Sequence, residues 1–262
     1  MTRIVNNCVA LVCLCLFWGQ SLRAADASHS EQIKWGNESV FNEEHNTLGL
    51  FSGVLGGQIV LAGGTSDDYS RWGRNAVCLS ENARFALYED VLSKPLAYGA
   101  SITLSDGILC IGGRYSSQCY KDVFFVTMQQ GKLNVSEDWP PLPFPLSNAA
   151  GALLDNKVYL FGGRKSVSPS RLSDSFFVLD LSNKSRGWKE LPGYPGCVRE
   201  DAILVVQNNG VSPCLYLLGG QTETEEGLSS CLTDGYVYNP QLGKWSSLGS
   251  EFPKGICGAV AS

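Results

Sequence analysis

Four stretches decide the fold: QIVLAGG at residues 58–64, GILCIGG at 107–113, KVYLFGG at 157–163 and CLYLLGG at 214–220. Each stretch is a short apolar run that ends in a pair of glycines. The second glycine of each pair follows the previous one after 49, 50 and 57 residues. Self-similarity at a period of this length indicates a repeat architecture in which each repeat forms one supersecondary unit.

Each repeat holds further strand signals around its Gly-Gly strand. A strand of small residues precedes it, at 50–55, 98–104, 149–154 and 202–206. In three repeats an Asp-led strand follows, as KDVFFVTM from Lys121, SDSFFVLDL from Ser173 and TDGYVYNP from Thr233. A tryptophan then closes these repeats, at Trp139, Trp188 and Trp245. Four strands in this order predict one blade of a Kelch-type β-propeller, whose repeats are about 50 residues long.

The glycine pairs support an all-β fold. A Gly pair at the end of a strand permits φ > 0 and lets neighbouring blades approach closely. The rival interpretation, a dinucleotide-binding loop, requires a G-x-G-x-x-G turn that opens a helix. No amphipathic helical run follows any of the pairs, so we expect four-stranded blades throughout.

Both ends of the repeat region stop in the middle of a unit. IKWGNES around Trp35 resembles a closing strand with no blade before it, and GICGAVAS at 255–262 resembles a first strand with no Gly-Gly strand after it. At about 50 residues per blade, residues 28–262 hold about 4.7 blades, whereas propellers close with about 4–8. We expect a propeller domain over 28–262 that is incomplete at its C-terminus. The alternative is a five-bladed ring that pairs the Trp35 segment with the C-terminal strand.

Residues 1–27 predict export. Cys8–Trp18 is an apolar run of 11 residues, and it is followed by small residues at 21–27, which is the pattern of a secretory signal peptide. An uncleaved anchor is the weaker alternative, because spanning a bilayer takes about 20 apolar residues. We therefore expect a periplasmic or secreted chain with no membrane attachment after cleavage.

Composition excludes several classes of partner. The chain is 44% hydrophobic and 17% charged, as in globular proteins. Its net charge of −5, with Lys and Arg scattered, offers no basic surface for nucleic acid. No C-x-x-C pair occurs, and the two histidines, His29 and His45, precede the blades, so we expect no metal. Most cysteines are expected to be small buried hydrophobes, with Cys110–Cys119 or Cys197–Cys214 as candidate disulfides.

Three longer runs carry a resemblance to a known family. LGLFSGVLGGQIVLAGG at 48–64, LAYGASITLSDGILCIGG at 96–113 and LPFPLSNAAGALLDNKVYLFGG at 142–163 resemble the N-acetylneuraminate epimerases, also called sialic acid mutarotases. The resemblance covers most of residues 33–262, with the blade order of the cyclically permuted branch. It implies a six-bladed propeller, export to the periplasm, and interconversion of the α and β anomers of a small sugar acid without a cofactor.

The resemblance also implies a chemistry. Mutarotation needs a base and an acid at the anomeric hydroxyl and the ring oxygen. A guanidinium suits the sugar's carboxylate, because its planar fork makes two charge-assisted hydrogen bonds.

The family's catalytic pair is absent from this chain. In the family, the catalytic Glu directly follows an Asn-Gly at the Gly-Gly position, and an Arg comes six residues later. The corresponding positions here hold Arg114 and Tyr120, Arg164 and Leu172, and Gln221 and Leu232. The catalytic residues are therefore unassigned, and an inactive fragment is one outcome that the sequence allows.

Position within the blade predicts the substrate-binding residues. In Kelch propellers, the loop after each Gly-Gly strand and the start of each first strand face the channel mouth. The candidates are Arg114, Arg164, Tyr98, Asn148 and Arg199. The alternative for each is a loop residue or a blade-to-blade hydrogen bond. The long insert Thr65–Asp90, which contains Arg71 and Arg74, is expected to form a lid or helix over the channel, or else a solvated loop.

Two classes of function follow. The first is the mutarotase, and the second is a non-catalytic Kelch module that binds a glycan or a protein. A hydrolase is disfavoured, because the sequence has neither a G-x-S-x-G motif nor a histidine within the blades. The sequence makes no prediction of oligomeric state.

Overall fold

The computed structural model describes residues 48–80, 85–224 and 227–259, and its regular elements there are β-strands apart from one short helix. That helix is the 3₁₀ helix η1 (Leu181–Arg186). Within the described ranges, no helix is long and apolar enough to cross a membrane. The predicted signal peptide at 1–27 and the segment around Trp35 lie outside the described residues.

The strands form four antiparallel sheets of four strands each, and each sheet keeps its strands in chain order. Blade 1 consists of β1 (Leu48–Leu55), β2 (Gln58–Thr65), β3 (Ala76–Leu79) and β4 (Phe85–Tyr88). Blade 2 consists of β5 (Ala100–Thr103), β6 (Ile108–Ile111), β9 (Val123–Gln129) and β10 (Lys132–Ser136). Blade 3 consists of β11 (Ala150–Leu154), β12 (Lys157–Phe161), β15 (Phe176–Asp180) and β16 (Lys189–Glu190). Blade 4 consists of β17 (Ile203–Asn208), β18 (Pro213–Leu218), β21 (Gly235–Asn239) and β22 (Lys244–Ser247).

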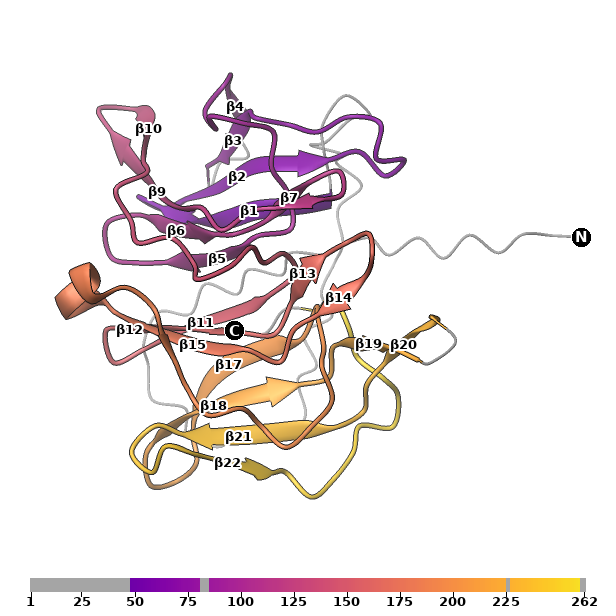
Figure 1. The fold of residues 1–262 in the computed structure, drawn as a ribbon. Coiled ribbons are helices and arrows are strands. Elements are labelled where there is room, and N and C mark those ends of the chain that lie inside the picture. Colours follow the sequence, from indigo (N-terminus) through magenta and orange to yellow (C-terminus); the bar gives the residue numbers. More distant parts are fainter. Residues whose placement is uncertain (1–47, 81–84, 225–226, 260–262) are drawn as a thin grey trace, which may run out of the picture.

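A small hairpin extends from blades 2, 3 and 4, between the second and third strands. The hairpins are β7 (Arg114–Tyr115) with β8 (Gln118–Cys119), β13 (Arg164–Ser166) with β14 (Arg171–Leu172), and β19 (Gln221–Glu223) with β20 (Ser229–Cys231). Each one starts directly after a Gly-Gly pair, and Figure 1 shows them on one side of the molecule. The side chains that follow the glycines are therefore gathered at one end of the blades.

The blades follow one another in chain order, from indigo to yellow in Figure 1, as a propeller requires. Their first strands β1, β5, β11 and β17 contact one another in succession. Buried apolar side chains fill the space between sheets, such as Phe51 and Ile108 between blades 1 and 2, and Phe161 and Tyr238 between blades 3 and 4. The predicted all-β propeller is confirmed, with four blades in the described part of the chain.

The glycine pairs have the predicted backbone role. Gly112 has φ of 64°, and a Cβ at this position would lie 2.2 Å from the carbonyl oxygen of Leu146 in the next blade. The amide of Gly113 donates to that same oxygen at 2.8 Å. The contact recurs in each blade, and at the last one Gly220 donates to Ile256 at 2.7 Å. The segment 255–259 thus bonds as the start of a further blade, although it forms no strand.

Two local expectations are corrected. The insert Thr65–Asp90 forms no helix in its described part. It contains a turn and the outer strands β3 and β4 of blade 1, because β3 pairs with β2 and β4 pairs with β3.

The cysteines differ from the prediction as well. The disulfide of the structure joins Cys231 to Cys257, whereas both cysteines of each predicted pair are free. Cys110 lies within the buried strand β6, where burial raises the pKa of its thiol, and so it packs as a small hydrophobe.

Candidate functional site

A continuous series of backbone hydrogen bonds connects the blades at the starts of their first strands. Its members are Gly49, Tyr98, Asn148, Asp201 and Gly258, and we call them the inner ring. The amide of each member donates to the carbonyl oxygen of the previous one, at 2.7, 2.7, 3.0 and 2.9 Å. All five have positive φ, from 52° to 64°. Three of them are not glycine, and side chains held in this uncommon backbone region are typical of functional sites.

The residues after the Gly-Gly pairs lie beside this ring. The backbone of Arg114 exchanges two hydrogen bonds with Ala97, at 2.7 and 3.0 Å, directly before Tyr98. Arg164 pairs in the same way with Ser147, and Gln221 with Glu200. The fold therefore brings the hairpin side chains and the inner-ring side chains together from blades 2, 3 and 4.

Arg114 sits in a cage of aromatic rings. Its guanidinium carbon is 4.4 Å from the ring centre of Tyr98, 5.2 Å from that of Trp72 and 5.6 Å from that of Tyr69. The side chain donates one hydrogen bond, to the carbonyl oxygen of Ser116 at 2.7 Å. No carboxylate of the described residues forms a salt bridge with Arg114. The cage thus holds the cation by cation–π attraction rather than by a salt bridge.

Arg164, unlike Arg114, forms salt bridges with carboxylates. Its Nε and Nη2 donate to both carboxylate oxygens of Glu200, at 2.8 and 2.5 Å, and Nη2 also donates to Glu223 at 2.9 Å. Ser170 donates to Glu223 as well, at 2.6 Å. That hydrogen bond and the guanidinium lower the pKa of Glu223, while the bond with Glu200 raises that of Arg164. Two carboxylates thus surround Arg164, so it offers little attraction for a further anion.

Asp201 is the carboxyl of the inner ring, and its pKa is strongly changed. Its Oδ1 accepts from Asn148 Nδ2 at 2.9 Å, and its Oδ2 accepts from Gln221 Nε2 at 3.4 Å. Burial raises the pKa of Asp201 to about 6, although the hydrogen bond from Asn148 acts against the rise. The charges of Arg164 and Arg114 also oppose it, which places both guanidinium groups within electrostatic reach of this carboxyl. A carboxyl with such a pKa exchanges protons near neutral pH.

The predicted site residues divide into two groups. The structure brings together Tyr98, Asn148, Arg114 and Arg164 at one end of the blades. Arg199 lies elsewhere: its side chain is 0% exposed and forms a two-pronged salt bridge with Asp234. An apolar residue occupies its position in the other blades, as Leu146 does, so Arg199 belongs to the interior rather than to the face with Arg114.

Two parts of the candidate site are not among the residues predicted from the sequence. Asp201 lies two residues before the first strand of blade 4, as Tyr98 and Asn148 do in blades 2 and 3. The small residue that follows each of them is the available signal. Tyr69 and Trp72 come from the turn of the insert, where neither residue matches a repeat position. This turn is the part of the insert that reaches the site, as the rings of Tyr69 and Tyr98 stack with centres 6.5 Å apart.

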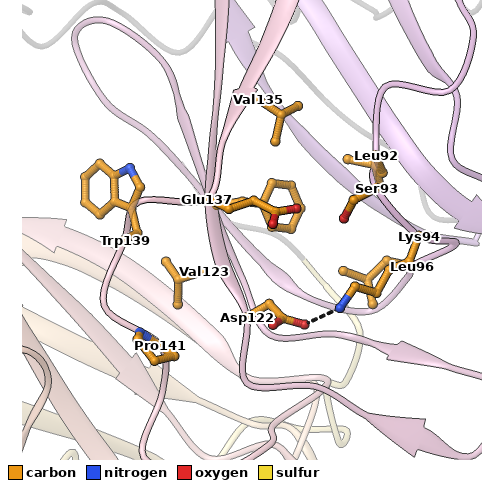
Figure 2. Close-up of a pocket in the computed structure, with 11 residues that line it drawn as sticks. Leu92, Ser93, Lys94, Leu96, Asp122, Val123, Val135, Glu137, Trp139 and Pro141 are labelled. Carbon is orange, nitrogen blue, oxygen red and sulfur yellow. Dashed lines mark hydrogen bonds and ion pairs between the residues drawn. The ribbon is translucent and has the colours of Figure 1, made fainter.

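A separate cavity of about 180 Å³ lies between the connector before blade 2 and the outer strands of that blade. Figure 2 shows Lys94 and Asp122 joined across one side of it, with Nζ and Oδ2 2.8 Å apart, and Glu137 and Trp139 further along the wall. The ion pair compensates the cation of this cavity, and Glu137 adds negative charge. The cavity is therefore poorly suited to an acidic ligand, and the inner ring with its neighbours is the better candidate site.

Comparison with known proteins points to one family. Residues 139–262 match the N-acetylneuraminate epimerase family. The N-acetylneuraminate epimerase of Yersinia pestis (strain Pestoides F) is 31% identical over 129 residues, which are 48% of this chain and 30% of that protein. The protein of the same name from Haemophilus influenzae (strain PittEE) is 31% identical over 124 residues, 47% of this chain and 30% of that protein.

Two further comparisons concern the fold. A Kelch domain-containing protein of Vibrio cholerae is 32% identical over 121 residues, 46% of this chain and 31% of that protein. The solved structure of YjhT superposes with a TM-score of 0.64 at 15% identity, covering 81% of this chain and 73% of that one. The matched segment thus spans less than a third of the curated relatives, while the propeller fold extends through most of the chain. The permuted blade order stays a prediction.

Proposed function

Because this chain is related to the N-acetylneuraminate epimerase family through residues 139–262, we propose that it binds N-acetylneuraminate and interconverts its α and β anomers. The observation that carries the proposal is the guanidinium of Arg114 beside the inner ring, which forms no salt bridge with the described residues. A sugar acid presents a carboxylate, and a guanidinium can bind both of its oxygens. The rings of Tyr69, Trp72 and Tyr98 offer apolar surface next to that anchor.

The cage also favours Arg114 over Arg164 as the anchor. Arg164 is engaged by Glu200 and Glu223, so a bound carboxylate would have to displace one of them. Arg114 would lose little, because its remaining donors are not held by carboxylates of the described residues. The proposal thus places the substrate's carboxylate at Arg114 of blade 2 and the rest of the sugar at blades 3 and 4.

The proposed reaction would take place outside the cytoplasm. The apolar run at 8–18 favours export, and we propose that the mature chain meets free sialic acid in the periplasm or outside the cell. The name shared by the Yersinia pestis and Haemophilus influenzae relatives is consistent with a small-molecule substrate of this class.

The test is anomer exchange followed by proton NMR. Freshly released α-N-acetylneuraminate is expected to convert to the β anomer faster with the protein than in buffer. Losing a pair of charge-assisted hydrogen bonds costs about 1.5–3 kcal/mol, so Arg114→Met should weaken binding roughly 10- to 150-fold. Arg186→Met, which removes an exposed arginine of η1, is the matched control and should bind as the wild type does. An exchange rate equal to that of buffer would reject the proposal.

A second candidate is a binding module without catalysis. It is favoured by one observation: Arg114, Arg164 and Gln221 occupy the positions at which the family resemblance calls for a Glu. The discriminating result is saturable binding of N-acetylneuraminate, sensitive to Arg114→Met, with no change in the exchange rate.

A further inference from the structure

Resting on the proposed function, we infer that Asp201 is the proton-transfer residue of the site, taking up and returning the proton of the sugar's anomeric hydroxyl. The positions of this sequence that correspond to the family's Glu hold Arg114, Arg164 and Gln221, which directs attention to the other carboxyls of the described blades. Asp201 is supplied by the inner ring rather than by a Gly-Gly loop.

The first argument is geometric. Asp201 lies on the inner ring, with φ of 52°, next to the side chains that the fold gathers from three blades. Its two oxygens accept from the neutral amides of Asn148 and Gln221. These amides orient the carboxyl without fixing its charge, because each can donate to an ionised or to a protonated carboxyl.

The neighbouring carboxylate shows the contrast. Glu200 is 4% exposed and is held at both oxygens by Arg164. The two-pronged bond with the guanidinium engages both oxygens of the Glu200 carboxylate, so neither is free for the sugar's hydroxyl. Two consecutive carboxyls therefore have different environments, which is how proteins divide acid–base and electrostatic roles between similar groups.

The charges that face Asp201 come from every side of the site. Glu200 directly precedes it in the sequence. Arg164 and Arg114 extend from the hairpins of blades 3 and 2, and Tyr98 is the inner-ring member of blade 2. Burial and Glu200 raise the pKa of Asp201, and the two guanidinium groups lower it, with a result of about 6. The carboxyl is thus ionised at neutral pH, and its conjugate acid is still strong enough to return the proton.

The proton balance of the reaction closes with water alone. Ionised Asp201 takes the proton of the anomeric hydroxyl while the bond from the anomeric carbon to the ring oxygen breaks, and the electron pair of that bond goes to the ring oxygen. The ring oxygen takes a proton from water, which gives the open-chain ketone. After rotation, the same hydroxyl adds to the other face of the ketone and returns its proton to the hydroxide that the water had become. The former carbonyl oxygen then takes the proton from Asp201, so no redox partner is consumed.

The experiment compares Asp201→Asn with Asp155→Asn. Asp155 is an exposed aspartate with φ of 49° in the β11–β12 turn, so the control makes the same chemical change at a similar backbone conformation. Asp201→Asn should reduce the protein's acceleration of anomer exchange by about 100-fold or more, with binding of N-acetylneuraminate changed by only a few-fold. Asp155→Asn should leave both unchanged.

Two further readouts distinguish proton transfer by Asp201 from a purely structural role of this residue. The wild-type kcat should fall as the pH drops through about 6, and the variant should lose that dependence. The carboxyl carbon of Asp201 in labelled wild-type protein should titrate near the same pH by NMR, which requires no variant. A variant that exchanges anomers like the wild type, or a carboxyl that titrates below about 4.5, would overturn the inference while the proposed function stands. A wild type that binds the sugar but does not accelerate exchange would overturn both.

Discussion

Replacing Arg199 with leucine is expected to destabilise the fold rather than to weaken ligand binding. The Arg199 guanidinium donates to both oxygens of Asp234, at 2.6 and 2.7 Å, and to the carbonyl oxygen of Gly219 at 2.7 Å. It also donates to the hydroxyl of Tyr194 at 2.8 Å. Removing it leaves the Asp234 carboxylate without its cation in a site from which water is largely excluded.

The size of the effect follows from the burial of the two partners. Removing one member of a buried ion pair costs about 3–5 kcal/mol. The side chain of Arg199 is 0% exposed but that of Asp234 is 29% exposed, so water can partly solvate the stranded carboxylate. We therefore expect a loss near the lower limit, about 3 kcal/mol in the free energy of unfolding.

Blade 3 supplies the matched second variant. Leu146 and Ser175 hold there the backbone positions that Arg199 and Asp234 hold in blade 4, as the glycine hydrogen bonds show. The double variant Arg199→Leu, Asp234→Ser thus copies a pair that the fold already accommodates. Since a buried ion pair can often be replaced by other well-packed residues at little cost, the double variant should lie within about 1 kcal/mol of the wild type.

Urea unfolding, followed by circular dichroism and by the fluorescence of the tryptophans, measures these differences. Arg186→Leu is the control, and it should change the free energy of unfolding by less than about 0.5 kcal/mol because its side chain is exposed. The reasoning is refuted if Arg199→Leu alone costs less than about 1 kcal/mol, or if the double variant is less stable than the single one.

Two further predictions concern stability. Gly112→Ala should lower the free energy of unfolding by more than about 2 kcal/mol in chemical denaturation, because a Cβ would lie 2.2 Å from a carbonyl oxygen of the next blade. Gly193→Ala is the control: a Cβ there would have no atom within 4 Å, so the change should be neutral or stabilising by up to about 1 kcal/mol. A similar loss in both variants would contradict the close approach of the blades. Asp201→Asn should be more stable than the wild type by up to about 3 kcal/mol at pH 8. The reason is that the folded chain disfavours the ionised carboxyl: the pKa of Asp201 is about 6, whereas that of the free group is 3.8. This advantage should shrink as the pH falls from about 6 to 4, and an advantage independent of pH would exclude the raised pKa.

The blades themselves could be predicted from the sequence, because each one repeats a short-range pattern. Apolar runs that end in Gly-Gly became the second strands, and the Asp-led runs became the third strands β9, β15 and β21. Blade 1 was less predictable, since its outer strands β3 and β4 match no other repeat. Cys231 and Cys257 lie 26 residues apart, and their pairing depends on where the hairpin β19–β20 folds back, which no local pattern specifies.

Four of the five predicted residues lie together at one end of the blades, whereas the side chain of Arg199 is buried in the interior. Tyr98, Asn148 and Asp201 are aligned by the small residue that follows each of them, Gly99, Ala149 and Ala202. Arg199 is two positions before Asp201, where blades 2 and 3 have leucine. A charged residue can occupy this interior position because the same blade supplies its counterion, Asp234.

The roles of Glu200 and Asp201 depend on tertiary structure alone. The two carboxyls are adjacent in sequence, yet successive side chains near a strand start point in different directions, so Glu200 meets Arg164 and Asp201 meets Asn148, while the amide of Gln221 donates to both. All three of those partners come from other positions of the repeat, 20 to 53 residues away. The propeller therefore fixes where a side chain stands, through the backbone ring, while the neighbouring blades decide its charge. It follows that a substitution on the inner ring can change the chemistry of this site without disturbing the blades that carry it.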